Sequence, residues 1–119
     1  MRDFRKLTVW KKSHEIAIAA YQLTTTFPAE EIYGLTNQIR RAATSVAANI
    51  AEGCGREGKK EFVHFLHIAL GSASELQYHL LLSRDLGFLE TPQCEDLLAK
   101  LDEVKKMVVS FVKKLRADG

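Results

Sequence analysis

The sequence contains few of the residues that break or cross-link a chain. Among its 119 residues there are two prolines, seven glycines and two cysteines. This composition excludes Pro-rich, collagen-like and disulfide-stapled folds. Cys54 and Cys94 are also too far apart in the sequence for the usual spacing of zinc ligands, so we expect free thiols. No apolar run reaches the roughly 18 residues of a membrane span, and we expect no contact with a membrane.

Strand-like alternation is rare as well. Over most of the chain apolar residues recur at intervals of three and four, the spacing of a helix. Hydrophobic residues make up 46% of the chain and charged residues 27%, a composition ordinary for one globular domain. The first residues, 1–7, carry charges but no apolar stretch, so we expect no signal peptide and a cytoplasmic protein.

The pattern predicts an all-α protein with four helices. They are expected at residues 8–25, 31–52, 59–86 and 92–116 of a single domain spanning 1–119. Thr8 and Thr91 are predicted N-caps, and Pro92 would follow as the first helical residue. Gly87 is expected to end the third helix. Short connections favour antiparallel neighbours, so the expected fold is an up-down four-helix bundle.

Each predicted helix carries an apolar stripe that should face the core. The stripes are Val9, Trp10, Ala17, Ile18 and Tyr21; Leu35, Ile39, Ala42, Val46 and Ile50; Phe62, Leu66, Ala69, Ala73, Leu76 and Leu80; and Leu97, Leu101, Val104, Val108, Phe111 and Leu115. Trp10 and Tyr33 are interpreted as anchors in the core or at an interface. The small residues Ala47, Ala48 and Ala51 lie outside the second stripe and favour assembly into a homo-oligomer.

A glycine-rich corner, N-I-A-E-G-C-G-R, separates the second helix from the third. We expect Gly53 and Gly55 to adopt positive φ angles and so to end the second helix. Asn49 and Glu52 should satisfy nearby backbone or arginine groups, with Arg56 as the expected partner of Glu52. The corner is therefore predicted to be structural.

The motifs that suggest catalysis or a cofactor lack their usual context. Residues 53–58 match G-x-G-x-x-G, but a helix precedes them where a dinucleotide site needs a strand. Glu61 and His64 form E-x-x-H, which di-iron bundles use on two helices and which occurs here once. Arg56 could lower the pKa of Cys54, although an isolated thiol is more often structural. We therefore expect no enzyme activity, cofactor or metal.

Positive charge is concentrated near both ends of the sequence, although the net charge is only +2. Ten residues are predicted to contact nucleic acid: Arg2, Arg5, Lys6, Lys11, Lys12, Lys105, Lys106, Lys113, Lys114 and Arg116. In an up-down bundle these two clusters lie at one end and can merge. A second candidate anion site consists of Arg56, Lys59 and Lys60 at the start of the third helix, unless that segment is only a turn.

Two adjacent arginines on the second helix leave a further choice open. Arg40 and Arg41 are either solvated, paired with Glu52 or Glu75, or in contact with phosphate. His64 and His67 could titrate near neutral pH at a subunit contact. For the two histidines, positions in the core, at an interface and in solvent all remain open.

Five segments of the sequence carry a resemblance to a known family. They are L-T-V-W-K-K, F-P-A-E-E-I-Y-G-L, Q-I-R-R-A-A, N-I-A-E-G-C-G-R and the segment 61–76. The chain resembles the four-helix-bundle proteins encoded within intervening sequences of bacterial 23S rRNA genes. It is similar, too, to the accessory variability determinant proteins of diversity-generating retroelements.

The resemblance implies a ring-like homo-oligomer, a pentamer in relatives, that binds nucleic acid and has no catalytic residues to carry over. A reverse transcriptase or another protein is a further implied partner. Two functions remain open: an oligomeric, non-enzymatic nucleic-acid-binding protein, and a scaffold whose basic surface docks an acidic protein.

Overall fold

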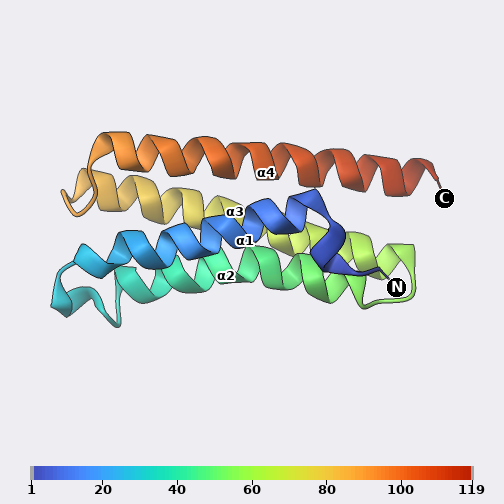
Figure 1. Cartoon of the computed structure of the whole chain (residues 1–119), viewed down its shortest axis with the longest axis horizontal. Helices are drawn as coiled ribbons and strands as arrows, with labels where there is room; N and C mark the ends of the chain where they lie inside the picture. Colours follow the sequence, from blue (N-terminus) through green and yellow to red (C-terminus); the bar gives the residue numbers. More distant parts are fainter. Residues whose placement is uncertain (1, 119) are drawn as a thin grey trace.

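The structure is a computed structural model that describes residues 2–118, and every regular element in that range is helical. Four long helices run alternately up and down along the 47 Å length of the molecule (Figure 1). They are α1 (Thr8–Leu23), α2 (Leu35–Cys54), α3 (Lys59–Asp85) and α4 (Thr91–Ala117), with 3-10 turns at η1 (Phe4–Lys6), η2 (Thr24–Thr26) and η3 (Ala29–Glu31). The predicted all-α fold is confirmed.

The helices pack in a ring in which each contacts the next one along the chain and α4 returns to α1. The pair α2 and α3 packs most extensively. No helix in the described part of the chain is both long enough and apolar enough to cross a membrane.

The core is lined by the stripes predicted for three of the helices. All stripe residues of α2 and α3 are buried, and in α4 only Phe111 remains half-buried. The prediction for α1 was partly wrong, because Ile18 and Tyr21 are each 46% exposed. The buried face of α1 consists of Val9, Ser13, Ile16, Ala17 and Ala20. Ser13 is tolerated there because its hydroxyl donates to the Val9 carbonyl at 2.8 Å.

Two predicted helix caps were wrong by one residue. Thr8 and Thr91 are the first helical residues of α1 and α4, and the N-caps are Leu7 and Glu90. Neither N-cap side chain bonds to the helix backbone. Pro92 lies in the first turn of α4 and has no amide hydrogen, so at this position there is no backbone donor for a cap to satisfy.

Helix α2 begins at Leu35, later than the expected start at residue 31. The chain first makes the turn η3, and Gly34 then serves as the N-cap. The Glu31 carboxylate accepts a hydrogen bond from the Leu35 amide at 3.0 Å, so an acidic side chain from before the helix satisfies its first turn. Helix α1 likewise ends early, at Leu23, and η2 continues it for one turn.

The glycines of the two helix–helix turns have different roles. Within residues 2–118 only Gly87 has a positive φ, at 81°. The Gly87 and Phe88 amides donate back to the Arg84 and Ser83 carbonyls, which closes the end of α3 as predicted. The prediction of positive φ at Gly53 and Gly55 was wrong: Gly53 lies inside α2, and Gly55 has a φ of −80°.

Gly53 is needed because helices α2 and α3 pack very closely at this position. A Cβ atom at this position would lie 2.7 Å from Cδ1 of Phe62 and 3.1 Å from Cβ of Phe65. Real Cβ atoms essentially never come within 3.0 Å of another side chain, so the absent Cβ of Gly53 is what lets Phe62 of α3 pack this close to α2.

Candidate nucleic-acid interface

Three separate segments meet at one end of the bundle. They are the N-terminal segment with η1, the corner between α2 and α3, and the C-terminal turn of α4 (Figure 1). The Arg2 amide donates to the Cys54 carbonyl at 2.9 Å, which ties the first segment to the corner. The Lys59 ammonium donates to the Asp118 carbonyl at 2.8 Å, which ties the corner to α4.

This end, which we call the basic end, is defined by residues 2–7, 52–62 and 111–118. It contains nine lysines and arginines and five carboxylates. The opposite end, residues 22–36 and 83–98, contains one arginine and six carboxylates, and we call it the acidic end. The net charge of +2 therefore hides a molecule that is electrically polarised along its long axis.

Not all of the predicted nucleic-acid-binding residues lie at the basic end. Those that do are Arg2, Arg5, Lys6, Lys113, Lys114 and Arg116, joined by the second candidate set, Arg56, Lys59 and Lys60. The remaining four, Lys11, Lys12, Lys105 and Lys106, lie further along α1 and α4. The structure thus merges two sets that the sequence treats as separate sites.

Several of these cations already have an acidic or polar partner. Lys12 pairs with Glu103 at 2.8 Å, and Lys106 pairs with Asp102 at 3.2 Å. The hydrogen bond to Glu103 raises the pKa of Lys12. Lys105 donates to the Gln77 side chain at 3.0 Å. The carboxylates beside Lys12 and Lys106 offset the positive charge of these two lysines, whereas Lys105 keeps its full charge beside the neutral Gln77.

Arg5 and Asp3 form a local pair within the N-terminal segment. The Arg5 guanidinium donates to Oδ1 of Asp3 at 3.1 Å, and this hydrogen bond lowers the pKa of Asp3 and raises that of Arg5. Both groups are solvent-accessible, so the pair stabilises the fold little. Its consequence is electrical, since the carboxylate of Asp3 offsets the positive charge that Arg5 would otherwise present.

Arg2 occupies the centre of the basic end. Its guanidinium carbon lies 5.6 Å from the ring centroids of both Phe62 and Phe111. No carboxylate within residues 2–118 forms a salt bridge with it. A cation held against aromatic faces while it stays exposed is available for an anion from solution.

The corner residues form the interactions expected of them. Arg56 donates to the Glu52 carboxylate at 3.2 Å, and its guanidinium lies 4.9 Å from the Phe65 centroid. Asn49 donates to the carbonyl of Ser45 at 2.8 Å and to its hydroxyl at 2.9 Å. Arg56 thus contributes to the packing of the corner as well as to its charge.

The Cys54 thiol is unsuited to nucleophilic chemistry. It is only 1% exposed, and this burial raises its pKa, with Arg2 acting weakly in the opposite direction. The alternative of a thiol activated by Arg56 is therefore wrong. Burial likewise raises the pKa of Cys94 at the acidic end.

Other candidate groups lie apart from the basic end. Tyr33 is 92% exposed, so it is no core anchor of this chain, whereas Trp10 is half-buried and stacks on His14 at 4.9 Å. Arg40 donates to the Thr24 hydroxyl at 2.9 Å and forms no salt bridge with the acids expected.

The histidines and acids do not gather into larger clusters. His64 and His67 are exposed, and His79 pairs with Glu75 at 3.1 Å. Among the described residues no group of three or more histidines, cysteines or acids could hold a metal ion.

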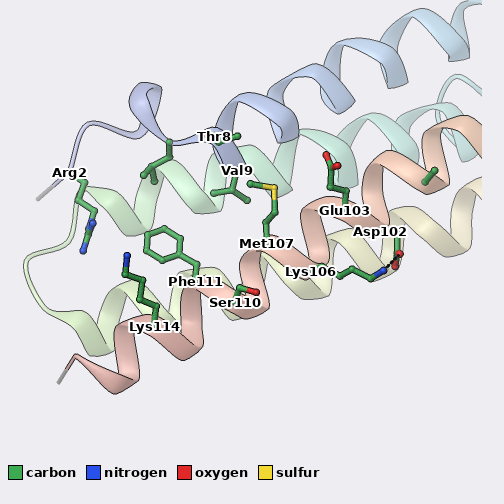
Figure 2. Close-up of a pocket in the computed structure, with 12 residues that line it drawn as sticks. Arg2, Thr8, Val9, Asp102, Glu103, Lys106, Met107, Ser110, Phe111 and Lys114 are labelled. Carbon is green, nitrogen blue, oxygen red and sulfur yellow. Dashed lines mark ion pairs between the residues drawn. The ribbon is translucent and has the colours of Figure 1, made fainter.

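An open groove of about 810 Å³ runs from the basic end along the junction of α1 and α4 (Figure 2). Its floor is formed by Leu7, Val9, Ala99, Met107 and Phe111. Sequence reasoning missed the groove, because its apolar residues were assigned to core stripes or to no site, although Arg2, Lys106 and Lys114 on its sides were among the predicted nucleic-acid contacts. Met107 is one apolar residue that lies outside the predicted stripe of α4 and lines the groove.

Comparisons with known proteins cover almost the whole bundle. Residues 5–110 match the family described as 23S rRNA-intervening sequence protein. The chain is also similar to a crystal structure of a protein with unknown function from the S23 ribosomal protein family of Bacteroides thetaiotaomicron VPI-5482. Identity is 28% and the TM-score is 0.81, over 89% of this chain and 99% of the other. No curated protein matches the chain.

The family match leaves out part of the basic end. Arg2 precedes the matched residues, and Lys113, Lys114 and Arg116 follow them. These four cations are therefore placed at the basic end by the structure of this chain and not by the family match.

Proposed function

The chain belongs to the 23S rRNA-intervening sequence protein family, and from this premise we propose that it is a non-enzymatic cytoplasmic protein that binds nucleic acid through its basic end. The observation that carries the proposal is the convergence of three distant segments into one surface with nine cations and five carboxylates. Phosphate is the natural partner of such a surface, because each contact releases counterions from the nucleic acid.

Phosphate contacts would supply most of the affinity. Arg2, Lys59, Lys60 and Lys114 lie on three different segments and form no salt bridge with a carboxylate of residues 2–118. Contacts to phosphate position a protein without reading sequence, so binding should tolerate changes of base sequence. It should also weaken steeply as the salt concentration rises.

We further propose that the protein acts as a homo-oligomer, a pentamer as in the relatives it resembles. Large apolar side chains remain exposed on the single chain: Ile18, Tyr21, Ile32, Tyr33, Ile68, Tyr78, Leu86 and Val109. Ala48 on α2 is exposed as well, and its small side chain would allow another helix to approach closely. Repetition of the basic end in one assembly would raise the affinity through avidity.

The oligomer is tested by changing Ala48→Glu. A charged side chain in a subunit contact should reduce the mass measured by light scattering while the helix content measured by circular dichroism stays the same. A wild-type mass equal to the 13.4 kDa monomer would overturn the oligomer.

The nucleic-acid proposal is tested with two variants that remove equal charge. The first changes Lys59, Lys60 and Lys114 to Gln at the basic end. The matched control changes Lys12, Lys100 and Lys106, three lysines that already form salt bridges, to Gln. Binding of single-stranded RNA, structured RNA and duplex DNA is measured by fluorescence anisotropy at several salt concentrations.

The first variant should lose affinity for every probe, and the slope of log K against log salt should fall by about 2 for a single strand. The control should change much less. Equal affinity of the two variants and the wild type would overturn the proposal. Pull-downs in which partners survive nuclease treatment would favour the rival function, a scaffold that docks an acidic protein such as a reverse transcriptase.

A further inference from the structure

The groove between α1 and α4 differs in charge along its length. Near its middle, Asp102 and Glu103 lie on the rim, and each is paired with a lysine. At the basic end the rim residues are Arg2 and Lys114, and neither forms a salt bridge with a carboxylate of residues 2–118. Only this end of the groove therefore offers uncompensated positive charge.

Arg2 and Lys114 converge on one aromatic ring. Figure 2 shows both charged groups close to each other on the same side of the Phe111 ring, Arg2 from the N-terminal segment and Lys114 from the next turn of α4. The Arg2 guanidinium carbon lies 5.6 Å from the Phe111 centroid. Two like charges that converge repel each other, and an anion between them would relieve the repulsion.

Apolar surface continues directly from this pair of cations into the groove. Met107 lies one turn before Phe111 on α4 and points across the groove toward Val9 of α1 (Figure 2). Phe111 is only half-buried, so part of its ring faces the groove. An occupant with an anionic group and a flat apolar group beside it would match both features.

We propose that the groove takes an unpaired nucleotide, with its phosphate between Arg2 and Lys114 and its base against Phe111 and Met107. This inference rests on the proposed function and adds to it a preference for single-stranded nucleic acid. A duplex presents its phosphates but keeps its bases stacked, whereas a single strand can place a base on an aromatic side chain. The groove, at about 810 Å³, lies in the size range of small-molecule sites.

The charge pattern disfavours an acidic amphipathic helix as the occupant. Such a helix would carry carboxylates along its length and would meet Asp102 and Glu103 on the rim. A nucleotide places its negative charge at one point only. The gradient along the groove thus fits a single anionic group at the basic end.

The test fills the groove without changing any charge. Ser110 is exposed on α4 and lines the groove, so Ser110→Leu places an apolar side chain in the path of the base. The matched control is Ser74→Leu, at an exposed position of α3 that does not line this groove. Circular dichroism checks that both variants retain their helices. The probes are a single-stranded oligonucleotide, an abasic strand of equal length and a duplex.

The wild type should bind the single strand about fivefold to tenfold more tightly than the abasic strand, the scale of one stacked base. Ser110→Leu should abolish this preference and leave duplex binding unchanged, and Ser74→Leu should behave as the wild type. Equal binding of normal and abasic strands by the wild type would overturn the groove inference while the proposed function stands. No binding of any probe at low salt would overturn both.

One more outcome would reject the nucleotide. If Ser110→Leu keeps the preference for the normal strand but loses binding to a synthetic acidic amphipathic peptide, the groove takes a protein helix.

Discussion

The two ends of the bundle are built from the same four helices but differ in charge and in how their turns close. The basic end gathers both chain termini and one interhelical corner, and the acidic end consists of two turns. At the acidic end, helix α3 is terminated by Gly87, which has a positive φ. At the basic end, Gly53 has no side chain, and this lets α3 pack closely against α2. Gly87 is thus required by the backbone conformation, and Gly53 is required by the packing of two helices.

The two ends also differ in charge, and this difference arises from the fold. The cations of the basic end come from three segments that are far apart in the sequence, and each segment supplies three of the nine. The fold itself creates the surface. Changes that separate these segments should therefore disturb binding as much as changes that remove charge.

The largest effect is expected for Gly53→Val. The new side chain would overlap Phe62, since a Cβ atom alone would lie 2.7 Å from its ring. Overpacking of this kind costs up to about 3 kcal/mol of unfolding free energy. Chemical denaturation followed by circular dichroism measures the loss. Gly53→Val combined with Phe62→Leu should recover part of it, and the absence of any recovery would contradict this explanation.

A smaller effect is expected for Gly87→Val at the acidic end. No atom lies within 4 Å of a Cβ at this position, so only the positive φ of 81° opposes a side chain. The cost should be about 1–2 kcal/mol. Gly87→Asn should cost less, because Asn tolerates this region, whereas Gly53→Asn should gain no such relief. Equal losses for Val and Asn at position 87 would show that backbone conformation is not the cause.

Asp3→Asn should strengthen binding at the basic end by about twofold to threefold. Asn keeps the side-chain oxygen that caps η1 but releases Arg5, which adds up to about 0.7 to the salt slope for a single strand. The hydrogen bond from Arg5 lowers the pKa of Asp3 from its ordinary value of 3.8, so Asp3 is fully charged at neutral pH. Its stabilising pair is complete above that ordinary pKa and is lost as the pH falls through the lowered value.

The advantage of Asp3→Asn should therefore stay constant at neutral and mildly acidic pH and fade only below about pH 4. Anisotropy titrations across this range provide the measurement. An advantage that disappears near neutral pH would contradict the assignment to Asp3.

The smallest effect is expected from removing charge at the acidic end. Changing Glu30, Glu90 and Glu95 to Gln raises the net charge by three, yet these residues lie far along the 47 Å molecule from the basic end. At physiological salt the Debye length is about 8 Å, so affinity for a single strand should change less than about twofold. A gain as large as the loss in the basic-end variant would mean that total charge, and not its position, governs binding.

Much of the fold was predictable because the apolar intervals of α2, α3 and α4 are regular. The stripe of α1 was harder to assign, since Ile18 and Tyr21 lie beside it and are apolar while Ser13 lies within it and is polar. Only the backbone hydrogen bond of Ser13 resolves this ambiguity. The role of Gly53 was equally hidden, because a sequence does not distinguish a glycine needed for φ from one needed for close packing.

The candidate site was predictable in part. The up-down topology places the α2–α3 corner at the same end as both termini, so the union of Lys59 and Lys60 with Lys114 followed from the expected fold. The pairing of Lys12 with Glu103 did not, because it depends on the register between α1 and α4. The groove depends on the same register, together with the position that the bond from Arg2 to Cys54 gives to the N-terminal segment.

Residues 2–7 and 111–118 lie together at the basic end, and this affects when the groove can form during synthesis of the chain. A ribosome makes the first of these segments before α1 and the second only with the last turns of α4. A growing chain that already contains α1, α2 and α3 has half of the groove and lacks Lys114. Competence to hold a nucleotide would therefore arise only once α4 has been made and closes against α1.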